Sequence, residues 1–314
     1  MQKTLGGRTL ALSMAGYLIA FKEKIGYLQI FMAAVIWGSY GLFVRALDYS
    51  PEYILFYRFL FGLLGLLAFI AIRDGLASMR PSLTHWKLML VPAAINCLSF
   101  LAYTYAINFT SVANAAFLIY TAPVFTVFFA PLMLKEKLEF RTILALIICL
   151  LGTATIMGYG GLFNVGLSLL GDFIALLGGM TYGFLALFLK RVPLAMLGPK
   201  SNTLSSGYIA LALLPFVLFS SQVLTWNSFL LLMFLGLLQQ AMGTTLFHLG
   251  LRKVQAQHAG ILTYAEPLGA TVMAALFLYE GITPGSILGG ALIITGGLIV
   301  ILRDSPKPVG KVTV

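Results

Sequence analysis

Two ionisable side chains lie in otherwise apolar segments of the chain. Placing a charge in such a segment costs free energy, so each is a candidate for a specific role. Glu266 lies in ILTYAEPLGATV, residues 261–272, and Arg58 lies in ILFYRFLFGLLGLL, residues 54–67. A carboxylate in such a segment can take up a proton or bind a cation, and a guanidinium can bind a carboxylate through paired hydrogen bonds. Both residues are therefore candidates for binding or moving a charged solute.

Each of these charges also has a purely structural interpretation. Glu266 could bond to a neighbouring helix near the carbonyl that Pro267 leaves free, and Arg58 could extend outward to Asp48 or Glu52. A charge at the centre of a bilayer costs about 3 kcal/mol on insertion scales and more than about 10 kcal/mol in simulations. We favour a coupling role for Glu266, through a proton or a cation, and a bracing role for Arg58. A direct bridge between them is a further alternative.

Other polar and aromatic side chains recur three, four or seven residues apart, which places them on one face of a helix. Gln240, Thr244 and His248 form one such row, and Asn96 and Tyr103 belong to another. Each alone is explained by a hydrogen bond between helices, but together they predict a cavity with aromatic walls and a few polar groups. The predicted substrate-binding residues are Trp37, Tyr40, Asn96, Tyr103, Asn114, Gln240, Thr244, His248 and Tyr264.

Five further residues receive predictions of their own. His258 lies eight residues before Glu266 on roughly the same helix face, so it is grouped with Glu266 and Arg58 as a coupling candidate, although a place at the cavity mouth explains it as well. Glu136 and Glu280 lie at the ends of two apolar segments, at equivalent positions, and we interpret both as structural residues. Pro123 and Pro267 are likewise structural.

The composition shows where these residues must reside. Hydrophobic residues make up 60% of the 314 positions and charged residues only 10%, whereas a soluble domain keeps about a quarter of its residues charged. Apolar segments of roughly 20 residues, enough to span about 30 Å of hydrocarbon as a helix, follow one another along the chain. The predicted transmembrane helices are 27–47, 51–72, 86–108, 109–134, 140–158, 168–190, 201–220, 226–249, 257–279 and 284–302.

The basic residues indicate how these helices are oriented. With the exceptions of Arg45 and Arg58, every Lys and Arg falls before the first segment, after the last, or in every second connection and the helix ends beside it. Such residues stay on the cytoplasmic side of bacterial-type membranes, so both termini are predicted to be cytoplasmic and the protein to be a multi-pass protein of the inner (plasma) membrane. The net charge of +10 then reflects topology and contact with the lipid bilayer, and no nucleic-acid partner is needed to explain it.

The sequence lacks the motifs of several classes of enzyme. There is no glycine-rich phosphate loop ending in Gly-Lys-Ser/Thr, no HExxH and no GxSxG. Three His and two distant Cys, Cys97 and Cys149, do not suggest a metal cluster. We therefore expect no enzyme activity, no cofactor and no metal.

The two halves of the chain repeat. Shifting residues 114–138 by 144 positions onto 258–282 aligns Tyr120 with Tyr264, Pro123 with Pro267 and Glu136 with Glu280. This predicts an all-α integral membrane protein of ten helices, built from two five-helix units that are inverted because five is odd. The predicted division is a leader 1–26, a first unit 27–158, a second unit 168–302 and a tail 303–314.

These segments resemble the drug/metabolite transporter superfamily, specifically its ten-helix EamA-type permeases. The resemblance covers about residues 27–303 and is carried by WGSYGLFVRAL, ILFYRFLFGLLGLL, YTAPVFTVFFAPLMLKEKL and YAEPLGATVMAALFLYEGIT. It implies a carrier of small organic solutes such as amino acids, often directed outward. The segment SSGYIALALLP of the second unit has no counterpart of Arg58, so that residue belongs to the first unit only.

Inverted repeats can exchange conformations and open a central site alternately to each side. We therefore expect a secondary active transporter, with export as its direction, that binds a small amphipathic metabolite near the bilayer midplane. The alternatives are an uncoupled facilitator or channel and a nucleotide-sugar or sugar-phosphate antiporter, for which several Lys or Arg in the site would be needed. The small-residue spacings Gly179-xxx-Gly183 and Gly285-xxx-Gly289 suit either a monomer or a homodimer.

Overall fold

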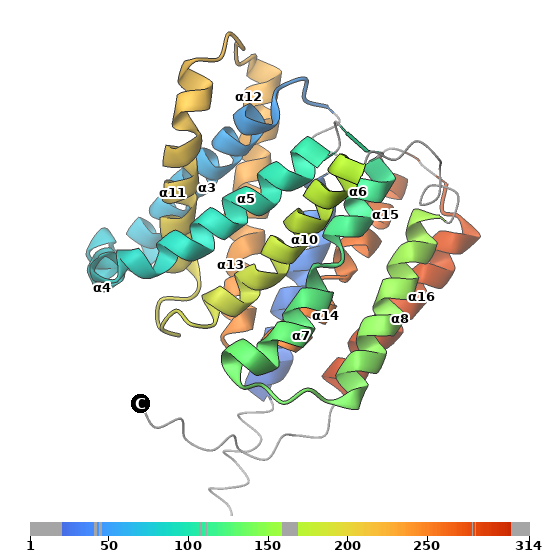
Figure 1. The fold of residues 1–314 in the computed structure, drawn as a ribbon. Coiled ribbons are helices and arrows are strands. Elements are labelled where there is room, and N and C mark those ends of the chain that lie inside the picture. Colours follow the sequence, from blue (N-terminus) through green and yellow to red (C-terminus); the bar gives the residue numbers. More distant parts are fainter. Residues whose placement is uncertain are drawn as a thin grey trace, which may run out of the picture.

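The computed structural model describes residues 21–40, 43, 46–106, 109–110, 112–158, 169–277, 279 and 281–302, of which 112–114 are described only in their backbone. All of the regular elements within these residues are helices, and they form a single bundle (Figure 1). In this part of the chain, nine helical stretches are long and apolar enough to cross a membrane. The protein is therefore an all-α membrane protein.

The first unit begins earlier than its hydropathy indicates. Within the described residues its first helix covers 21–38, so the last residues of the predicted leader, among them Lys22, Glu23 and Lys24, belong to this helix. The leader residues 1–20 lie outside the described residues. The helices that follow are α3 (Pro51–Arg73), α5 (Leu90–Ala106), α6 (Val112–Ile119), α7 (Ala122–Leu134) and α8 (Phe140–Met157).

The connection between α3 and α5 is itself helical. It consists of the short elements η1 (Leu76–Met79), α4 (Arg80–Thr84) and η2 (Trp86–Met89), which project from one side of the bundle (Figure 1). The sequence predicted a loop between helices 51–72 and 86–108, marked by turn residues such as Asp74-Gly75 and Arg80-Pro81, whereas η2 continues into α5 as one span, Trp86–Ala106.

The second unit repeats the pattern. Its helices are α10 (Leu169–Leu189), α11 (Pro199–Leu218), α12 (Trp226–Leu235), the π-helical segment η3 (Gly236–Gly243), α13 (Thr244–Leu251), α14 (Ala256–Leu262), α15 (Ala265–Phe277) and α16 (Pro284–Ile301). The elements α12, η3 and α13 form one continuous span from Trp226 to Leu251. The tail 303–314 lies outside the described residues.

Two predicted spans are interrupted, and the interruptions are equivalent. One falls at residues 120–121, between α6 and α7, and the other at 263–264, between α14 and α15. Pro123 and Pro267 follow these breaks within the first turn of the next helix, where a residue without an N–H is tolerated, and neither can bond to the carbonyl four residues earlier. Irregular backbone at membrane depth is expected only where protein or a cavity surrounds it.

The contacts between the two units are reciprocal, which is the signature of a two-fold relation. Helices α8 and α16 lie side by side and run in opposite directions (Figure 1). A Cβ on Gly152 would lie 2.7 Å from the carbonyl oxygen of Gly289, and a Cβ on Gly296 would lie 2.9 Å from that of Ala145. These pairs exchange under the shift of 144 positions.

A second pair of glycines repeats the relation in the centre of the bundle. A Cβ on Gly38 would lie 2.4 Å from the carbonyl oxygen of Glu266, and a Cβ on Gly183 would lie 2.4 Å from that of Ala122. Real Cβ atoms essentially never come this close to a backbone oxygen. The absence of a side chain therefore allows the first helix to approach α15, and α10 to approach α7, in equivalent ways.

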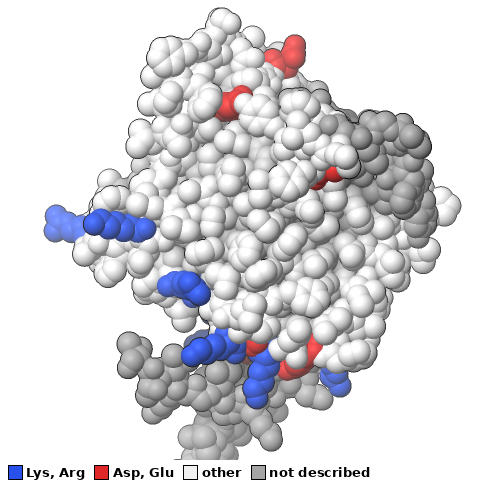
Figure 2. Space-filling view, viewed as in Figure 1, with Lys and Arg blue, Asp and Glu red and all other residues white. Residues whose placement is uncertain are grey.

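The outer surface has the character of a lipid-facing one. Large apolar side chains are fully presented on it, with Phe219 90%, Ile72 88% and Leu169 87% exposed. Lys and Arg gather along the lower and left parts of the molecule, as Figure 2 shows. We call this part the basic end. Apart from Arg58, the described cations are those that the sequence predicts on one side of the membrane: Lys22, Lys24, Arg73, Arg80, Lys87, Lys135, Lys137, Arg141, Lys190, Arg191, Lys200, Arg252 and Lys253.

Candidate functional site

A cavity of about 230 Å³ lies between the two units. It receives side chains from both units and from the neighbourhood of both helix breaks. The residues that line it are Trp37, Gly38, Tyr40, Arg58, Asn96, Ser99, Phe100, Tyr103, Ile119, Tyr120, Tyr182, Leu185, Gln239, Thr244, Phe247, His248, Glu266 and Ala270.

Arg58 reaches the cavity from α3 and is 2% exposed. Its guanidinium carbon lies 4.5 Å from the ring centre of Phe100 and 5.0 Å from that of Tyr40, so aromatic faces stabilise the charge. Its Nε and Nη1 atoms have no hydrogen-bond partner among the described residues. A buried cationic donor without a partner is costly, and the cavity is where a ligand acceptor could supply one.

The predicted brace for Arg58 is not formed within the described part of the chain. The Glu52 carboxylate instead accepts a hydrogen bond from the Tyr105 hydroxyl, and no ion pair joins Arg58 to Asp48 or Glu52. Aromatic packing replaces the expected carboxylate because the α3 face that carries Arg58 turns toward the centre of the bundle.

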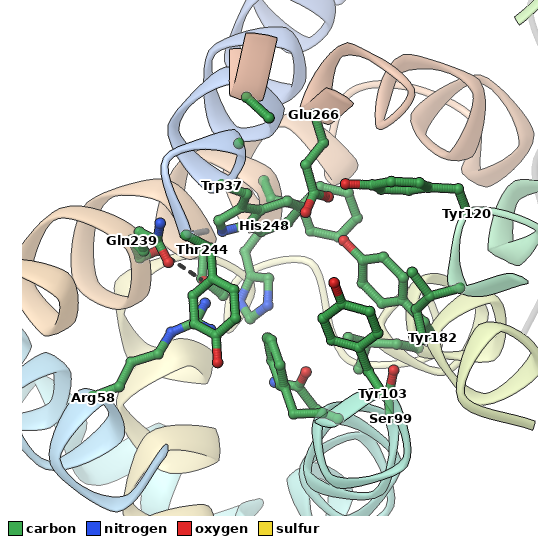
Figure 3. A pocket seen from close by; sticks show the side chains of 18 residues that line it. Trp37, Arg58, Ser99, Tyr103, Tyr120, Tyr182, Gln239, Thr244, His248 and Glu266 are labelled. Carbon is green, nitrogen blue, oxygen red and sulfur yellow. Dashed lines mark hydrogen bonds between the residues drawn. The ribbon is translucent and has the colours of Figure 1, made fainter. Parts of the chain in front are cut away.

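Glu266 enters the cavity from the first turn of α15, just after the helix break. Figure 3 shows its carboxylate pointing into the cavity beside Tyr120, while Arg58 extends in from the opposite side. The two opposite charges act on each other across this space, yet no ion pair links them within the described residues. The cavity therefore presents a separated positive and negative group.

Aromatic rings form most of the remaining wall. The Trp37 and Phe247 ring centres lie 5.2 Å apart, and those of Trp37 and Tyr182 lie 6.5 Å apart. Tyr40 and Phe100 follow at 6.4 Å. Such walls suit the apolar part of a small molecule, and the buried Trp37 Nε1, which has no partner among the described residues, is a further donor.

Helix α5 supplies the polar row that its spacing predicted. Asn96 and Tyr103 both line the cavity, with Ser99 between them, and Asn96 is 6% exposed. The Ser99 hydroxyl donates to the carbonyl of Gly178 on α10 at 3.1 Å. This residue therefore serves helix packing as well as the cavity.

The row on the eighth span is displaced by one residue. Thr244 and His248 line the cavity, but Gln239 does so in place of the predicted Gln240. The π-helical segment Gly236–Gly243 inserts one residue into the turn, and the Thr244 hydroxyl accordingly donates to the Gln239 carbonyl five residues earlier at 3.3 Å. An ordinary helix would have placed residues four apart on this face.

Gln240 points to α11 instead. Its side-chain amide donates to Asn202 Oδ1 at 2.7 Å and to Ser206 Oγ at 3.0 Å. Gln239 donates to Ser39 Oγ at 2.9 Å, while its own Oε1 has no partner among the described residues. His248 Nδ1 shares a hydrogen bond of 2.9 Å with Ser201 Oγ, which ties the cavity wall to the start of α11.

Two predicted site residues besides Gln240 lie outside the cavity lining. Tyr264 is fully buried in the core, whereas its repeat mate Tyr120 lines the cavity. His258 shares a hydrogen bond of 2.9 Å with the Tyr27 hydroxyl near the basic end, away from Glu266. The break after residue 262 redirects the chain, so a spacing of eight residues does not keep a common face. The Asn114 side chain lies outside the described residues.

The structural residues have definite contacts. The Glu136 carboxylate accepts hydrogen bonds from the backbone N–H groups of Ala256 at 2.8 Å and Gln257 at 3.3 Å, at the start of α14. Nearby, Lys190 donates to the Val254 carbonyl, and burial lowers the pKa of its ammonium. Pro123 and Pro267 are buried at the helix breaks, and Glu280 lies outside the described residues.

Several lining residues were missed, and the repeat could have identified two of them. Tyr182 is the repeat mate of Trp37, and Tyr120 is the mate of Tyr264. Gln239 had no signal in the sequence, since a π-helical turn is not marked by a residue type. Phe100 and Phe247 were indistinguishable from lipid-facing or core aromatics.

Comparison with known proteins identifies relatives over nearly the whole chain. Residues 24–158 and 169–302 each match the EamA-like transporter family. An uncharacterized transporter of Archaeoglobus fulgidus is 30% identical over 276 residues, which cover 88% of this chain and 96% of the relative. The uncharacterized transporter YxxF of Bacillus subtilis is 27% identical over 301 residues, covering 92% and 94%.

Two further similarities concern location and fold. The uncharacterized inner membrane transporter YicL of Salmonella typhimurium is 26% identical over 297 residues, covering 90% of this chain and 96% of the relative. A solved structure titled "Crystal structure of protein" superposes with a TM-score of 0.75 at 19% identity, covering 88% of this chain and 96% of that one. At that identity the likeness concerns the fold alone.

Proposed function

Because this chain belongs to the EamA-like transporter family, we propose that it is a secondary active transporter that moves a small amphipathic metabolite, such as an amino acid, by alternating access. The observation that carries the proposal is a pair of opposite charges, Arg58 and Glu266, that no ion pair joins within the described residues, in a cavity between two related units.

The cavity suits a molecule that bears both charges. A ligand carboxylate would satisfy the free Nε and Nη1 donors of Arg58, and a ligand amine would face Glu266. The aromatic rings between them would cover the apolar part. A nucleotide sugar or sugar phosphate carries several negative charges, whereas Arg58 is the only cation that lines the cavity in the described part of the chain, so this class fits less well.

Alternating access would use the reciprocal contacts between the units. At the basic end, Glu136 binds the start of α14, and all seven residues of α14 are buried. We interpret these contacts as the closed side of the cavity. Exchange of the two units between their conformations would break them and close the opposite side instead.

The basic end would face the cytoplasm. Short cytoplasmic connections carry an excess of Lys and Arg, and the named relative YicL is described as an inner membrane transporter. We therefore place this protein in the inner membrane with both termini cytoplasmic. Export is the direction we propose, by resemblance to the family.

The first experiment identifies the ligand and separates a carrier from a channel. A metabolite panel is screened for compounds that raise the unfolding temperature of the purified protein, since a ligand that binds only the folded state stabilises it. Each hit is then tested for counterflow in liposomes. A carrier accelerates uptake of labelled solute when unlabelled solute is inside, whereas flux that neither saturates nor shows counterflow indicates a facilitator or channel.

The second experiment tests coupling through Glu266. We expect Glu266→Gln to abolish the pH dependence of transport, because the amide keeps the shape of the side chain but cannot exchange a proton. Thr244→Val, a cavity variant without a titratable group, is the matched control and should retain the pH dependence. A pH profile that is the same in Glu266→Gln and in the wild type would exclude a coupling role.

A further inference from the structure

A second hollow lies on the outer surface, separate from the central cavity. It has a volume of about 460 Å³ and is bounded by α3, the η1–α4 connection and α11. Its walls are almost entirely aliphatic, with Leu63 and Leu67 on α3, Leu83 on α4 and Leu211 on α11. None of its lining residues is shared with the central cavity.

The groove is open to the lipid and has room at its base. Leu211 is 68% exposed and Leu83 is 50% exposed. Among the described residues, a Cβ added to Gly207 would touch only Leu63, at 3.9 Å, so space remains above this glycine at the base of the groove. By contrast, many glycines at helix contacts have neighbours within 3 Å of such an atom, as at Gly152 and Gly183.

The segment that covers one end of the groove has the pattern of an interfacial element. Residues 76–89 carry exposed apolar side chains, among them Leu76 and Trp86, together with the exposed cations Arg80 and Lys87. Trp86 packs near Tyr208 at 6.4 Å between ring centres, and the Tyr208 hydroxyl donates to the Trp86 carbonyl at 3.3 Å. Aromatic residues in such positions mark the boundary between hydrocarbon and headgroups.

Positive charge collects at this end of the groove. Lys200 donates to the Ser78 carbonyl at 2.7 Å, which holds its ammonium beside η1. Arg80 and Lys87 lie on the same connection, and residues 75–89 contain no Asp or Glu. The nearest carboxylate in sequence, Asp74, forms an ion pair with Arg73 at 2.7 Å and also attracts Lys200, so the cations outnumber this one acid. Figure 1 places α4, which carries Arg80, at the left of the bundle, and Figure 2 shows Lys and Arg side chains at the left edge of the same view.

We propose that this groove binds one acyl chain of an anionic phospholipid from the leaflet at the basic end, with the lipid phosphate at Arg80, Lys87 and Lys200. The aliphatic walls match the chain, and the three cations match the anionic headgroup. A central-cavity substrate would need polar partners that these walls lack, and a second copy of the chain would bring its own basic end against this one.

The test is native mass spectrometry of protein released from nanodiscs of phosphatidylglycerol or of phosphatidylcholine with the same acyl chains. The wild type is expected to retain a single phosphatidylglycerol in preference to phosphatidylcholine. Arg80→Gln with Lys87→Gln should lower that retention by about fivefold for each cation removed, whereas Arg141→Gln, at the basic end but on α8, should not. Both changed residues of the double variant are exposed, so the fold is not at risk.

The groove itself is tested by filling it. Gly207→Leu should reduce retention of either lipid several-fold, and Gly207→Ala, which leaves most of the space open, should behave as the wild type. Equal retention of the two lipids by the wild type, or unchanged retention in Gly207→Leu, would overturn the proposal. It would also be overturned if Gly207→Leu converted a dimer to a monomer in size-exclusion chromatography with light scattering, because the occupant would then be a second chain.

Discussion

The surroundings of the Arg58 side chain differ from those that the sequence predicts. Its position predicts an outward brace, but its guanidinium lies among Tyr40, Phe100 and Phe59 with donors left unpaired. The aromatic rings stabilise the charge of Arg58, while its Nε and Nη1 atoms remain available to donate to a ligand acceptor.

We expect Arg58→Lys and Arg58→Gln each to lower the affinity for a carboxylate-bearing substrate by about tenfold or more, since hydrogen bonds to charged groups contribute about 1.5–3 kcal/mol each. Lysine retains the charge but loses the planar fork. Ligand-induced shifts in unfolding temperature measure the effect, with Arg141→Gln as the control. Unchanged affinity together with a large loss of stability would instead indicate a brace.

Two adjacent glutamines, Gln239 and Gln240, are expected to have different roles, and substitutions distinguish them. Gln240→Leu removes two buried hydrogen bonds to α11 and should lower the free energy of unfolding by about 1–3 kcal/mol. Gln239→Leu changes the cavity wall and should reduce substrate affinity more than Gln240→Leu does. If Gln240→Leu reduced substrate affinity more than Gln239→Leu, Gln240 and not Gln239 would face the substrate, which would contradict the π-helical register. Thermal unfolding and ligand titration distinguish the two outcomes.

At the scale of elements, glycine decides which helices can touch. The first helix meets α15 at Gly38, and α10 meets α7 at Gly183, both with a backbone carbonyl where a side chain would stand. The helix breaks beside these contacts place Glu266 and Tyr120 in the cavity.

We expect Gly183→Ala and Gly38→Ala to lower the free energy of unfolding by similar amounts, roughly 1–3 kcal/mol, because overpacking forces the backbone apart. Gly281→Ala is the matched control, since no atom lies within 4 Å of the added Cβ. Unfolding temperatures in detergent provide the measurement. If only one of the two variants is destabilised, the central contacts are not equivalent.

At the scale of the whole molecule, the inverted units and the basic end make a prediction about topology. In a protein whose Cys97 and Cys149 are replaced by alanine, Arg141→Cys should react with a membrane-impermeant maleimide only from the cytoplasmic side. Val223→Cys, in the connection between α11 and α12 and 79% exposed in the wild type, should react only from outside. Labelling of both positions from the same side would contradict the proposed orientation.

The membrane class, the helical fold, the family and the existence of two repeated units follow from the sequence alone. Hydropathy and repeated proline and glycine positions are local or periodic properties, so they can be recognised in the sequence without coordinates. The charged residues Glu266 and Arg58 were identifiable for the same reason, since a charge within an apolar segment is visible without coordinates.

Tertiary structure alone decided which residues share the cavity. Gln239 replaces Gln240 because of a π-helical turn, Tyr264 and His258 leave the lining because the ninth span is broken, and Arg58 finds aromatic rings rather than a carboxylate. Each of these outcomes depends on the direction in which a helix face points once it meets its neighbours. That direction is set by packing between segments far apart in the chain, and no single segment contains it.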